Sequence, residues 1–332
     1  IIRLMAFRFN LLDHPKAHGI HTHPVPRIGG IAIYVAFVVG SLFRLDLSEQ
    51  LKGVLVGSTI IFAVGLWDDI RHLRASVRLF AQLLACGIMM FKYGVILQTF
   101  PHGHFINSFF TVFLIIGITN AVNFLDNMDG LSAGLVAISS FTIFAVAYMT
   151  DQPWTAYLAL ALTGAAAGFL VFNLRPAYFF MGDSGSTFLG FTLASLTVMT
   201  EWSYDVPVRM AVPILILGVP IIDMTLITVL RILEDKVCTF RQWIDYTGKD
   251  HLSHRVMRLG LTKQVTVLVL WGIQALFCVV AIWTIPHGFR DGVLGLLFFV
   301  FMLLGVIVFF RKRRSLALRW NGRPPRGKRN SK

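Results

Sequence analysis

Carboxylates are scarce in this chain, and several stand next to apolar stretches rather than in charged loops. Only 17 of the 332 residues are Asp or Glu, against 30 Lys and Arg. Asp68 and Asp69 end one apolar stretch, and Asp126 and Asp129 follow another. Carboxylates placed this close repel each other in a low-dielectric setting unless a cation intervenes. Mg²⁺ suits such a set, because it takes one or two carboxylates and completes its octahedron with water and substrate phosphates.

Two further segments carry groups suited to an anion. Residues 181–186 read Met-Gly-Asp-Ser-Gly-Ser, a short turn that we expect to lead into a helix near Thr187. Free backbone N–H groups at such a helix start favour an anion, or an acid-ligated metal beside one, and Asp183 is the natural metal ligand there. A later segment places His251 and His254 among basic side chains, which hold phosphate oxygens well.

Spacing suggests how the second acidic segment is presented. Four polar residues there step by three, which places neighbours on adjacent parts of one helical face. Adjacent Asp68 and Asp69 would instead point about 100° apart on a helix, so only one of them should aim at any single point. The residues expected on the one helical face are Asn120, Asn123, Asp126 and Asp129.

The elements that position these groups are membrane helices, because lipid must be the main solvent of this chain. Hydrophobic residues make up 56% of the sequence, charged residues only 14%, and Phe occurs 29 times. Soluble domains have about a quarter charged residues. We therefore expect an all-α, polytopic transmembrane bundle with about ten spans of roughly 20 residues, and an eleventh if an N-terminal span precedes Ile1. The ten lie near 29–46, 53–67, 79–97, 107–122, 130–149, 154–172, 185–200, 207–230, 265–285 and 292–310.

Basic residues predict the orientation of the bundle, since Lys and Arg favour cytoplasmic loops. With residues 1–28 inside and the spans alternating, all the acidic and histidine motifs fall on the cytoplasmic side. We expect one transmembrane catalytic domain over 1–310, with a cytoplasmic substrate loop at 231–264. The basic tail at 311–332 is either drawn to the anionic inner leaflet or simply solvated. The predicted inner segments are 1–28, 68–78, 123–129, 173–184, 231–264 and 311–332, and only five of the thirty Lys and Arg fall outside them: Arg44, Lys52, Lys92, Arg209 and Arg290.

Each motif alone also has a structural interpretation. An acid at the end of a span reaches headgroup water, so Asp68–Asp69 could be structural, and Asp183 could be a helix N-cap. Asp223 lies one to two turns inside a span, where acids are costly and usually functional, although packing against Arg231 or Arg209 would also explain it. The convergence of five acids on one face of the membrane is harder to explain by structure alone and favours phosphate chemistry on a lipid.

Five motifs, taken in order, resemble the polyprenyl-phosphate N-acetylhexosamine-1-phosphate transferases of glycosyltransferase family 4. The resemblance covers Pro24 to about Arg258. It implies transfer of a sugar-1-phosphate from a UDP-sugar to undecaprenyl phosphate with release of UMP, in the bacterial cytoplasmic membrane, with Mg²⁺ or Mn²⁺ as cofactor and no nucleic-acid partner. It leaves a homodimer open. The motifs are Pro24–Gly30, Asp68–Asp69, Asn120–Gly130, Phe172–Ala177 with Met181–Ser186, and Asp250–Arg255.

The resemblance also implies roles for individual residues. Asp183 would be the main magnesium ligand, with Asp68 as a second. Asp68 and Asp69 would bind metal or activate the lipid phosphate, while Asp126 and Asp129 would take part in catalysis at the nucleotide and metal site. The residues expected to bind substrate are Asn123, Asn173, His251, His254, Arg255 and Arg27.

The histidine motif departs from the family's pattern, and other functions remain as alternatives to the transferase. Ser253 stands where the family's His-x-His-His motif has a histidine, so either that histidine is dispensable or the loop's contacts differ here. The peptidoglycan branch carries three consecutive histidines, which this chain lacks, and this favours UDP-N-acetylglucosamine over UDP-MurNAc-pentapeptide. A transporter would place acids near the midplane, where only Asp223 is a candidate, and a membrane scaffold would leave the clustered acids unexplained.

Overall fold

The computed structural model describes residues 12–13, 25–26, 29–42, 48–100, 103–174, 177–234 and 250–321, with side chains as far as residue 313. Within these ranges the regular secondary structure is helical, except for one short antiparallel pairing of β1 (Leu12–Asp13) with β2 (Val25–Pro26). The predicted all-α architecture is therefore confirmed. Arg27 and residues 235–249 of the predicted 231–264 loop lie outside the described residues.

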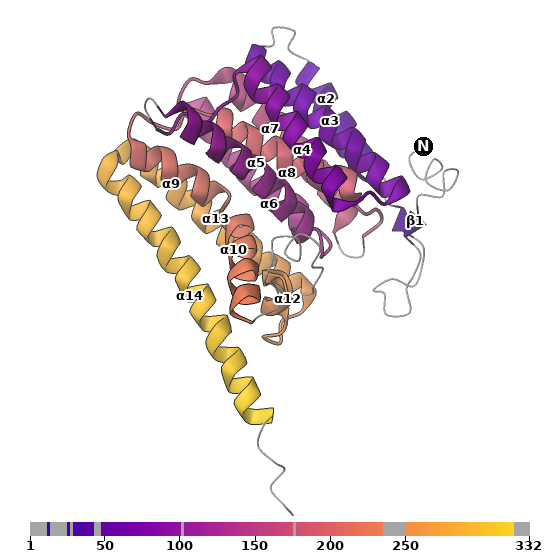
Figure 1. Cartoon of the computed structure of the whole chain (residues 1–332), viewed down its shortest axis with the longest axis vertical. Coiled ribbons are helices and arrows are strands. Elements are labelled where there is room, and N and C mark those ends of the chain that lie inside the picture. Colours follow the sequence, from indigo (N-terminus) through magenta and orange to yellow (C-terminus); the bar gives the residue numbers. More distant parts are fainter. Residues whose placement is uncertain are drawn as a thin grey trace, which may run out of the picture.

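Among the described helices, α2 to α7 form a bundle around α8 (Figure 1). Almost every residue of α8 is buried, and α2, α3, α5, α6 and α7 all pack against it. Several of its hydroxyls bond to the preceding turn or to a neighbouring helix, as in the 2.9 Å hydrogen bond between Thr192 and Ser58 of α3. The helices are α2 (Gly29–Leu42), α3 (Glu49–Arg71), α4 (Ala75–Tyr93), α5 (His104–Leu125), α6 (Leu131–Met149), α7 (Pro153–Asn173) and α8 (Gly182–Met199).

The remaining helices cover one flank of this bundle and extend beyond it (Figure 1). Helix α14 packs along α9 and continues as a helix through Asn321, so the first part of the predicted basic tail prolongs the last span. The short α12 lies at the end of the bundle where the acidic motifs gather. These elements are α9 (Val206–Ile216), α10 (Gly218–Leu233), α12 (Leu252–Met257), α13 (Lys263–Thr284), the 3₁₀ helix η1 (Ile285–His287) and α14 (Phe289–Asn321).

Every predicted span coincides with a helix or a pair of helices, but not all are ordinary spans. Seven described helices are long and apolar enough to cross a membrane, or up to eight if the bent pair is one span. Helix α2 is shorter than these, and α8 is not among them. The chain is a multi-pass membrane protein with fewer full-length spans than the ten expected.

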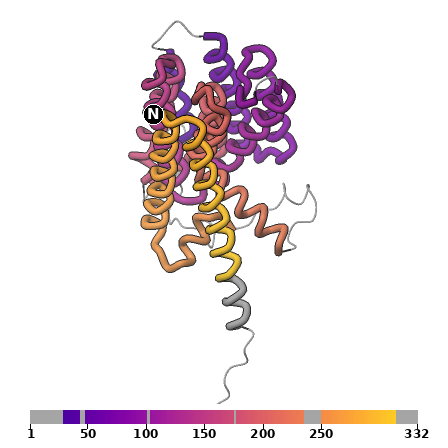
Figure 2. Tube along the Cα trace, turned by 90° about the vertical axis from the view of Figure 1, so that its left-hand side faces the viewer, coloured from indigo at the N-terminus to yellow at the C-terminus, as the bar shows by residue number. Residues whose placement is uncertain are grey.

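The span predicted at 207–230 is a pair of helices and not a single one. Helices α9 and α10 meet at an angle of 80°, and the far end of α10 projects away from the other helices (Figure 2). Pro213 lies inside α9 just before the break, where it lacks the N–H for the helical hydrogen bond and crowds the preceding turn. The bend turns α10 towards α12.

Candidate active site

Asp69 joins the end of α3 to the beginning of α8. Its carboxylate accepts hydrogen bonds from the backbone N–H groups of Asp183 and Ser184, at 2.7 and 3.0 Å. These are free donors at a helix start, which a side chain usually caps. Helix α8 begins at Gly182, earlier than the expected Thr187. The cap of α8 therefore comes from another helix, and Asp183 is left to face the site.

Asp68, next to it, points to a different partner. Its carboxylate accepts from Arg78 of α4 at 2.9 Å and from the backbone N–H of Leu73 at 2.5 Å. The same Arg78 guanidinium lies 3.6 Å from the carboxylate of Asp183. Two predicted metal ligands thus share one arginine, and the two adjacent aspartates aim at different groups, as their helical spacing predicts.

Glycines allow the close approach that brings these helix ends together. A Cβ on Gly65 of α3 would stand 2.6 Å from the Cα of Ser184, and one on Gly30 of α2 would stand 2.5 Å from the backbone nitrogen of Gly185. The N–H groups of Gly29 and Gly30 also donate to carbonyls of the segment before α8, at 3.0 and 2.9 Å. The Gly-Gly motif therefore abuts the site.

Asp126 and Asp129 do not lie on one helical face with Asn120 and Asn123, which corrects the sequence prediction. Helix α5 ends at Leu125, and both acids belong to the turn before α6. Gly130 adopts a left-handed conformation at the end of this turn (φ 78°), which glycine tolerates, and α6 begins at the next residue. The turn directs the Asp126 carboxylate to the Ser132 hydroxyl at 2.8 Å.

The two predicted asparagines tie this turn to its neighbours. The Asn123 side-chain oxygen accepts from the hydroxyl of Ser186 on α8 at 2.8 Å. Buried Asn173 accepts from the N–H of Gly130 at 2.8 Å and donates to the carbonyl of Phe179 at 2.9 Å. In this structure Asn173 braces the loops around the acids, and its contact with substrate stays a prediction.

Electrostatics at the site favour a cation. Burial, followed by the charges of Asp183, Asp129 and Asp69, raises the pKa of Asp126 to about 7, although its hydrogen bond from Ser132 acts in the opposite direction. A carboxylate shifted in this way by its neighbours gains stability when a positive ion joins them. An all-oxygen set of this kind is what Mg²⁺ prefers.

The arrangement does not form a cage of three protein ligands. Among the described residues, no three His, Cys, Asp or Glu side chains lie close enough together to hold one ion. Mg²⁺ commonly binds through one or two carboxylates and completes its shell with water and substrate phosphates. The site therefore fits a magnesium ion that Asp183 and one neighbour hold together with a bound diphosphate.

Helix α12 carries the histidine motif and docks onto α10. Asp250 forms a buried pair with Arg231 at 2.7 and 2.8 Å, and the Nε of Arg255 donates to the Asp250 carbonyl at 2.7 Å. Burial alone would raise the pKa of Asp250, but its hydrogen bonds from Arg231 and the nearby positive charges outweigh that and lower it. Arg255 is thus largely buried, and His254 lies half-buried on the same helix.

Neither arginine proposed as a partner of Asp223 pairs with it. Arg231 binds Asp250, and Arg209 donates to carbonyls of Gln98 and Tyr204 at the other end of the bundle. Asp223 instead accepts from the backbone N–H of Leu252 and contacts His251. Sequence reasoning chose partners by charge, whereas the fold supplies a hydrogen-bond donor and a histidine.

Ser253, the departure from the histidine motif, is fully buried. Its hydroxyl donates to the side-chain oxygen of Asn127 at 2.8 Å. Asn127 directly follows Asp126, so this bond joins α12 to the acidic turn. The position is a packed junction between two parts of the site.

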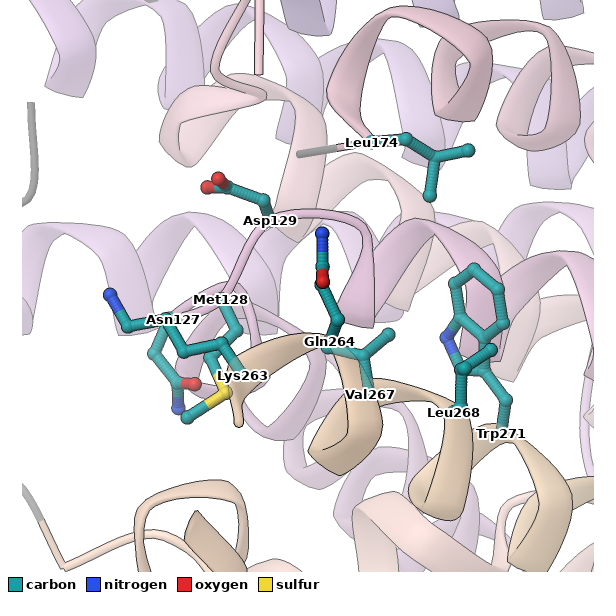
Figure 3. A pocket seen from close by; sticks show the side chains of 9 residues that line it. All are labelled: Asn127, Met128, Asp129, Leu174, Lys263, Gln264, Val267, Leu268 and Trp271. Atoms are coloured by element: carbon teal, nitrogen blue, oxygen red, sulfur yellow. The ribbon is translucent and has the colours of Figure 1, made fainter. Parts of the chain in front are cut away.

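One hollow borders the acidic turn, and a second runs along α5. A pocket of about 300 Å³ lies between the acidic turn and α13, with Asn127, Asp129 and Lys263 on one side and Leu268 and Trp271 on the other (Figure 3). A larger apolar groove of about 570 Å³ runs along α5 and the bent pair. Its lining includes Phe113, Gly117, Ala121, Pro213, Met224 and Val229.

Sequence reasoning missed two groups of site residues. Arg78 was not among the predicted site residues, although its position ten residues after Asp68 was a usable signal. Ser132 was not predicted because hydroxyls are common, and Ser186 was part of a predicted motif but its partner Asn123 was not foreseen. Three-dimensional packing alone reveals them.

Comparison with known proteins identifies the family of this chain. The family pattern described as "Glycosyl transferase family 4" matches residues 51–201. A Bacillus subtilis (strain 168) protein named "Probable undecaprenyl-phosphate N-acetylglucosaminyl 1-phosphate transferase" is 34% identical over 291 residues, covering 85% of this chain and 79% of its own length. The chain belongs to glycosyl transferase family 4.

Other members of the family are similar over most of their length. The Mycolicibacterium smegmatis "Decaprenyl-phosphate N-acetylglucosaminephosphotransferase" is 28% identical, covering 81% of this chain and 74% of its own. The Escherichia coli O157:H7 "Undecaprenyl-phosphate alpha-N-acetylglucosaminyl 1-phosphate transferase" is 26% identical, covering 91% and 84%. This family 4 chain is thus an enzyme of the sugar-1-phosphate transferase type.

Proposed function

We propose that this protein transfers N-acetylglucosamine-1-phosphate from UDP-N-acetylglucosamine to undecaprenyl phosphate, at the cytoplasmic face of a bacterial membrane. The observation that carries the proposal is the gathering of acids from three helix ends. Asp68 and Asp183 share Arg78, Asp69 caps the start of α8, and the charges of Asp183 and Asp69 act on Asp126 after α5. The names of the Bacillus and Escherichia relatives support the sugar and the acceptor.

The reaction needs positioning and charge neutralisation more than covalent chemistry. An oxygen of the lipid phosphate attacks the phosphorus that carries the sugar, and the bond from this phosphorus to the oxygen of the nucleotide's own phosphate breaks. UMP leaves, and undecaprenyl-diphospho-N-acetylglucosamine remains. When bound, Mg²⁺ would supply positive charge to the donor's diphosphate, and Asp183 with Asp68 would hold it.

The chain's own groups have separate tasks in this scheme. Arg78 lies between Asp68 and Asp183, where its planar guanidinium can bind phosphate oxygens in a bidentate manner. Asp126 has a pKa of about 7, so it can accept a proton from the lipid phosphate at neutral pH. Asp69 keeps α8 in place so that Asp183 faces the substrates.

The two hollows suit the two substrates. The apolar groove runs along α5 towards the acids, which suits a long isoprenoid chain whose phosphate must reach Asp126. The smaller pocket beside Asp129 combines amide, carboxylate and amine groups with an indole, which suits part of a nucleotide sugar. Acceptor and donor would then approach the carboxylates from different sides.

Purified protein in nanodiscs, given Mg²⁺, undecaprenyl phosphate and UDP-N-acetylglucosamine, should release UMP and form one lipid-linked sugar for each UMP. EDTA should abolish turnover, and added Mg²⁺ should restore it. Parallel reactions with UDP-N-acetylgalactosamine and UDP-MurNAc-pentapeptide test the sugar. A folded protein that releases no UMP from any of these donors contradicts the proposal, and preference for the pentapeptide donor replaces it with lipid I synthesis.

A further inference from the structure

Asp223 is fully buried on α10, outside the acidic cluster, and holds the beginning of α12. One carboxylate oxygen accepts from the backbone N–H of Leu252 at 2.6 Å, and the other lies 2.9 Å from Nδ1 of His251. Burying a carboxylate is costly unless its oxygens are hydrogen-bonded, and both oxygens of Asp223 have such partners. The proposed reaction does not use this acid directly.

The contact with Asp223 restricts how His251 can act. An ionised carboxylate only accepts hydrogen bonds, so Nδ1 of the imidazole must carry a hydrogen and donate it. The neutral ring then presents Nε2 as an acceptor, and the protonated ring presents it as a donor. In both forms the carboxylate fixes the ring's orientation, as acidic partners of functional histidines commonly do.

His251 lies beside the acidic turn. Its ring centroid is 5.5 Å from that of Phe124, which precedes Asp126 by two residues. Ser253, two residues further along, donates to Asn127 of the same turn. The side chain of His251 is 12% exposed, so most of it is fixed by protein contacts and a small part remains accessible to a ligand.

We propose that Asp223 is a positioning residue that acts through His251, fixing the tautomer and orientation of this imidazole for contact with the UDP-sugar. The inference rests on the proposed function. The carboxylate touches no substrate. It sets which imidazole nitrogen is offered to the UDP-sugar.

A purely structural role makes a different prediction. The bond from Leu252 holds α12 whatever side chain stands at position 251, so the loss caused by substituting Asp223 would be independent of His251. A positioning role makes that loss disappear once the imidazole is gone. A double-mutant cycle measures this difference directly.

The cycle compares kcat/KM for UMP release in the wild type, Asp223→Asn, His251→Ala and the double variant. Asparagine keeps the shape and can still accept from Leu252, but its amide N–H₂ facing Nδ1 favours the opposite imidazole tautomer. Asp223→Asn should lower kcat/KM by about 10- to 100-fold, the usual loss for a partner that orients a functional histidine. In the His251→Ala background the same change should cost less than about 3-fold. Equal losses in both backgrounds overturn the proposal.

NMR spectroscopy tests the proposal without an activity assay. In ¹⁵N-histidine NMR spectra at alkaline pH, the His251 signal, assigned by its absence from His251→Ala, should show the Nδ1–H tautomer in the wild type and Nε2–H in Asp223→Asn. The same tautomer in both contradicts the inference. A wild type without turnover would instead refute the proposed function and leave this result intact.

The chain offers a matched control at the junction of α13 and α14. Asp291 lies 4.0 Å from Nδ1 of His287, a second Asp–His pair with an exposed histidine. Asp291→Asn should leave kcat/KM within about 2-fold of the wild type. If Asp223→Asn fails to fold, the cycle is run with Asp223→Glu, which keeps the charge but displaces the carboxylate, and additivity with His251→Ala again overturns the proposal.

Discussion

Helices α8 and α14 are built on opposite plans within one membrane protein. Helix α8 carries Ser or Thr at six of its 18 positions and is buried along nearly its whole length. Helix α14 is the most apolar of the candidate spans, and only 11% of its apolar window is buried. In lipid, apolar side chains mark the surface, while small and polar residues mark helix–helix contacts. Helix α8, which is not among the candidate membrane spans, is therefore the one of the two that carries part of the site.

The difference explains why Asp183 can stand where it does. Its helix begins among the ends of α2, α3 and α5, so Asp69 can cap the free N–H groups and leave the carboxylate of Asp183 facing Arg78. An acid in the exposed middle of α14 would face lipid, where it would have no such partners. Burial within the bundle therefore gives the polar groups of the site the hydrogen-bond and charge partners that they would lack in lipid.

The largest expected effect separates Asp183 from an acid outside the site. Asp183→Asn should lower kcat for UMP release by about 10³-fold, because it removes a charged ligand from the phosphate-binding centre. Asp291→Asn, on α14, should retain wild-type activity. Equal activities for Asp183→Asn and the wild type would remove the start of α8 from the site.

Substitutions on α8 should also lower the free energy of unfolding more than substitutions on α14. Phe191→Ala, in the buried middle of α8, should lower the free energy of unfolding by about 3–5 kcal/mol. Leu304→Ala, on the exposed face of α14, should change it by less than about 0.5 kcal/mol. Unfolding in mixed micelles measures both, and a larger loss for Leu304 would reverse the comparison.

A smaller effect is expected at the junction between α12 and the acidic turn. Ser253→Ala removes the hydrogen bond to Asn127 and should cost about 1 kcal/mol of stability. Ser253→His, which restores the family's residue, should cost about 1–3 kcal/mol because it overpacks a fully buried position. Activity assays should show no gain from the added histidine. A more active Ser253→His variant would mean that the position faces substrate.

The smallest effect is the pH dependence of the Arg231–Asp250 pair. The folded-state pKa of Asp250 is lowered, so its contribution to stability is present above the ordinary Asp value of about 3.9 and is lost as pH falls through the folded value. The Tm of the wild type should therefore exceed that of Asp250→Asn by a constant margin above about pH 5 and by less at pH 3. A margin that grows on acidification contradicts the assigned sign.

The sequence predicted the positions of the helices well, because long apolar runs and the placement of Lys and Arg follow directly from the bilayer. It predicted the polar motifs of the site for the same reason, since acids stand out against apolar helices. It did not predict the 80° bend after Pro213, because proline kinks a helix only to the extent that packing allows.

The remaining errors concern side-chain partners. The three-residue spacing of Asn123, Asp126 and Asp129 predicted one helical face, but α5 ends at Leu125 and both acids lie in the turn before α6. Pairing with an arginine was the structural alternative for Asp223, whereas the fold places the start of α12 against it. Such contacts join residues far apart in the chain, so local pattern carries no signal for them.

The central claim is that Asp183 and its neighbours hold a divalent cation against the donor's diphosphate. Electron paramagnetic resonance of Mn²⁺ added to the protein tests it most directly. With UDP-N-acetylglucosamine present, the wild type should bind one Mn²⁺ with ³¹P hyperfine coupling, and Asp183→Asn should lose that signal. Undiminished coupling in Asp183→Asn, or none in the wild type, would contradict the account.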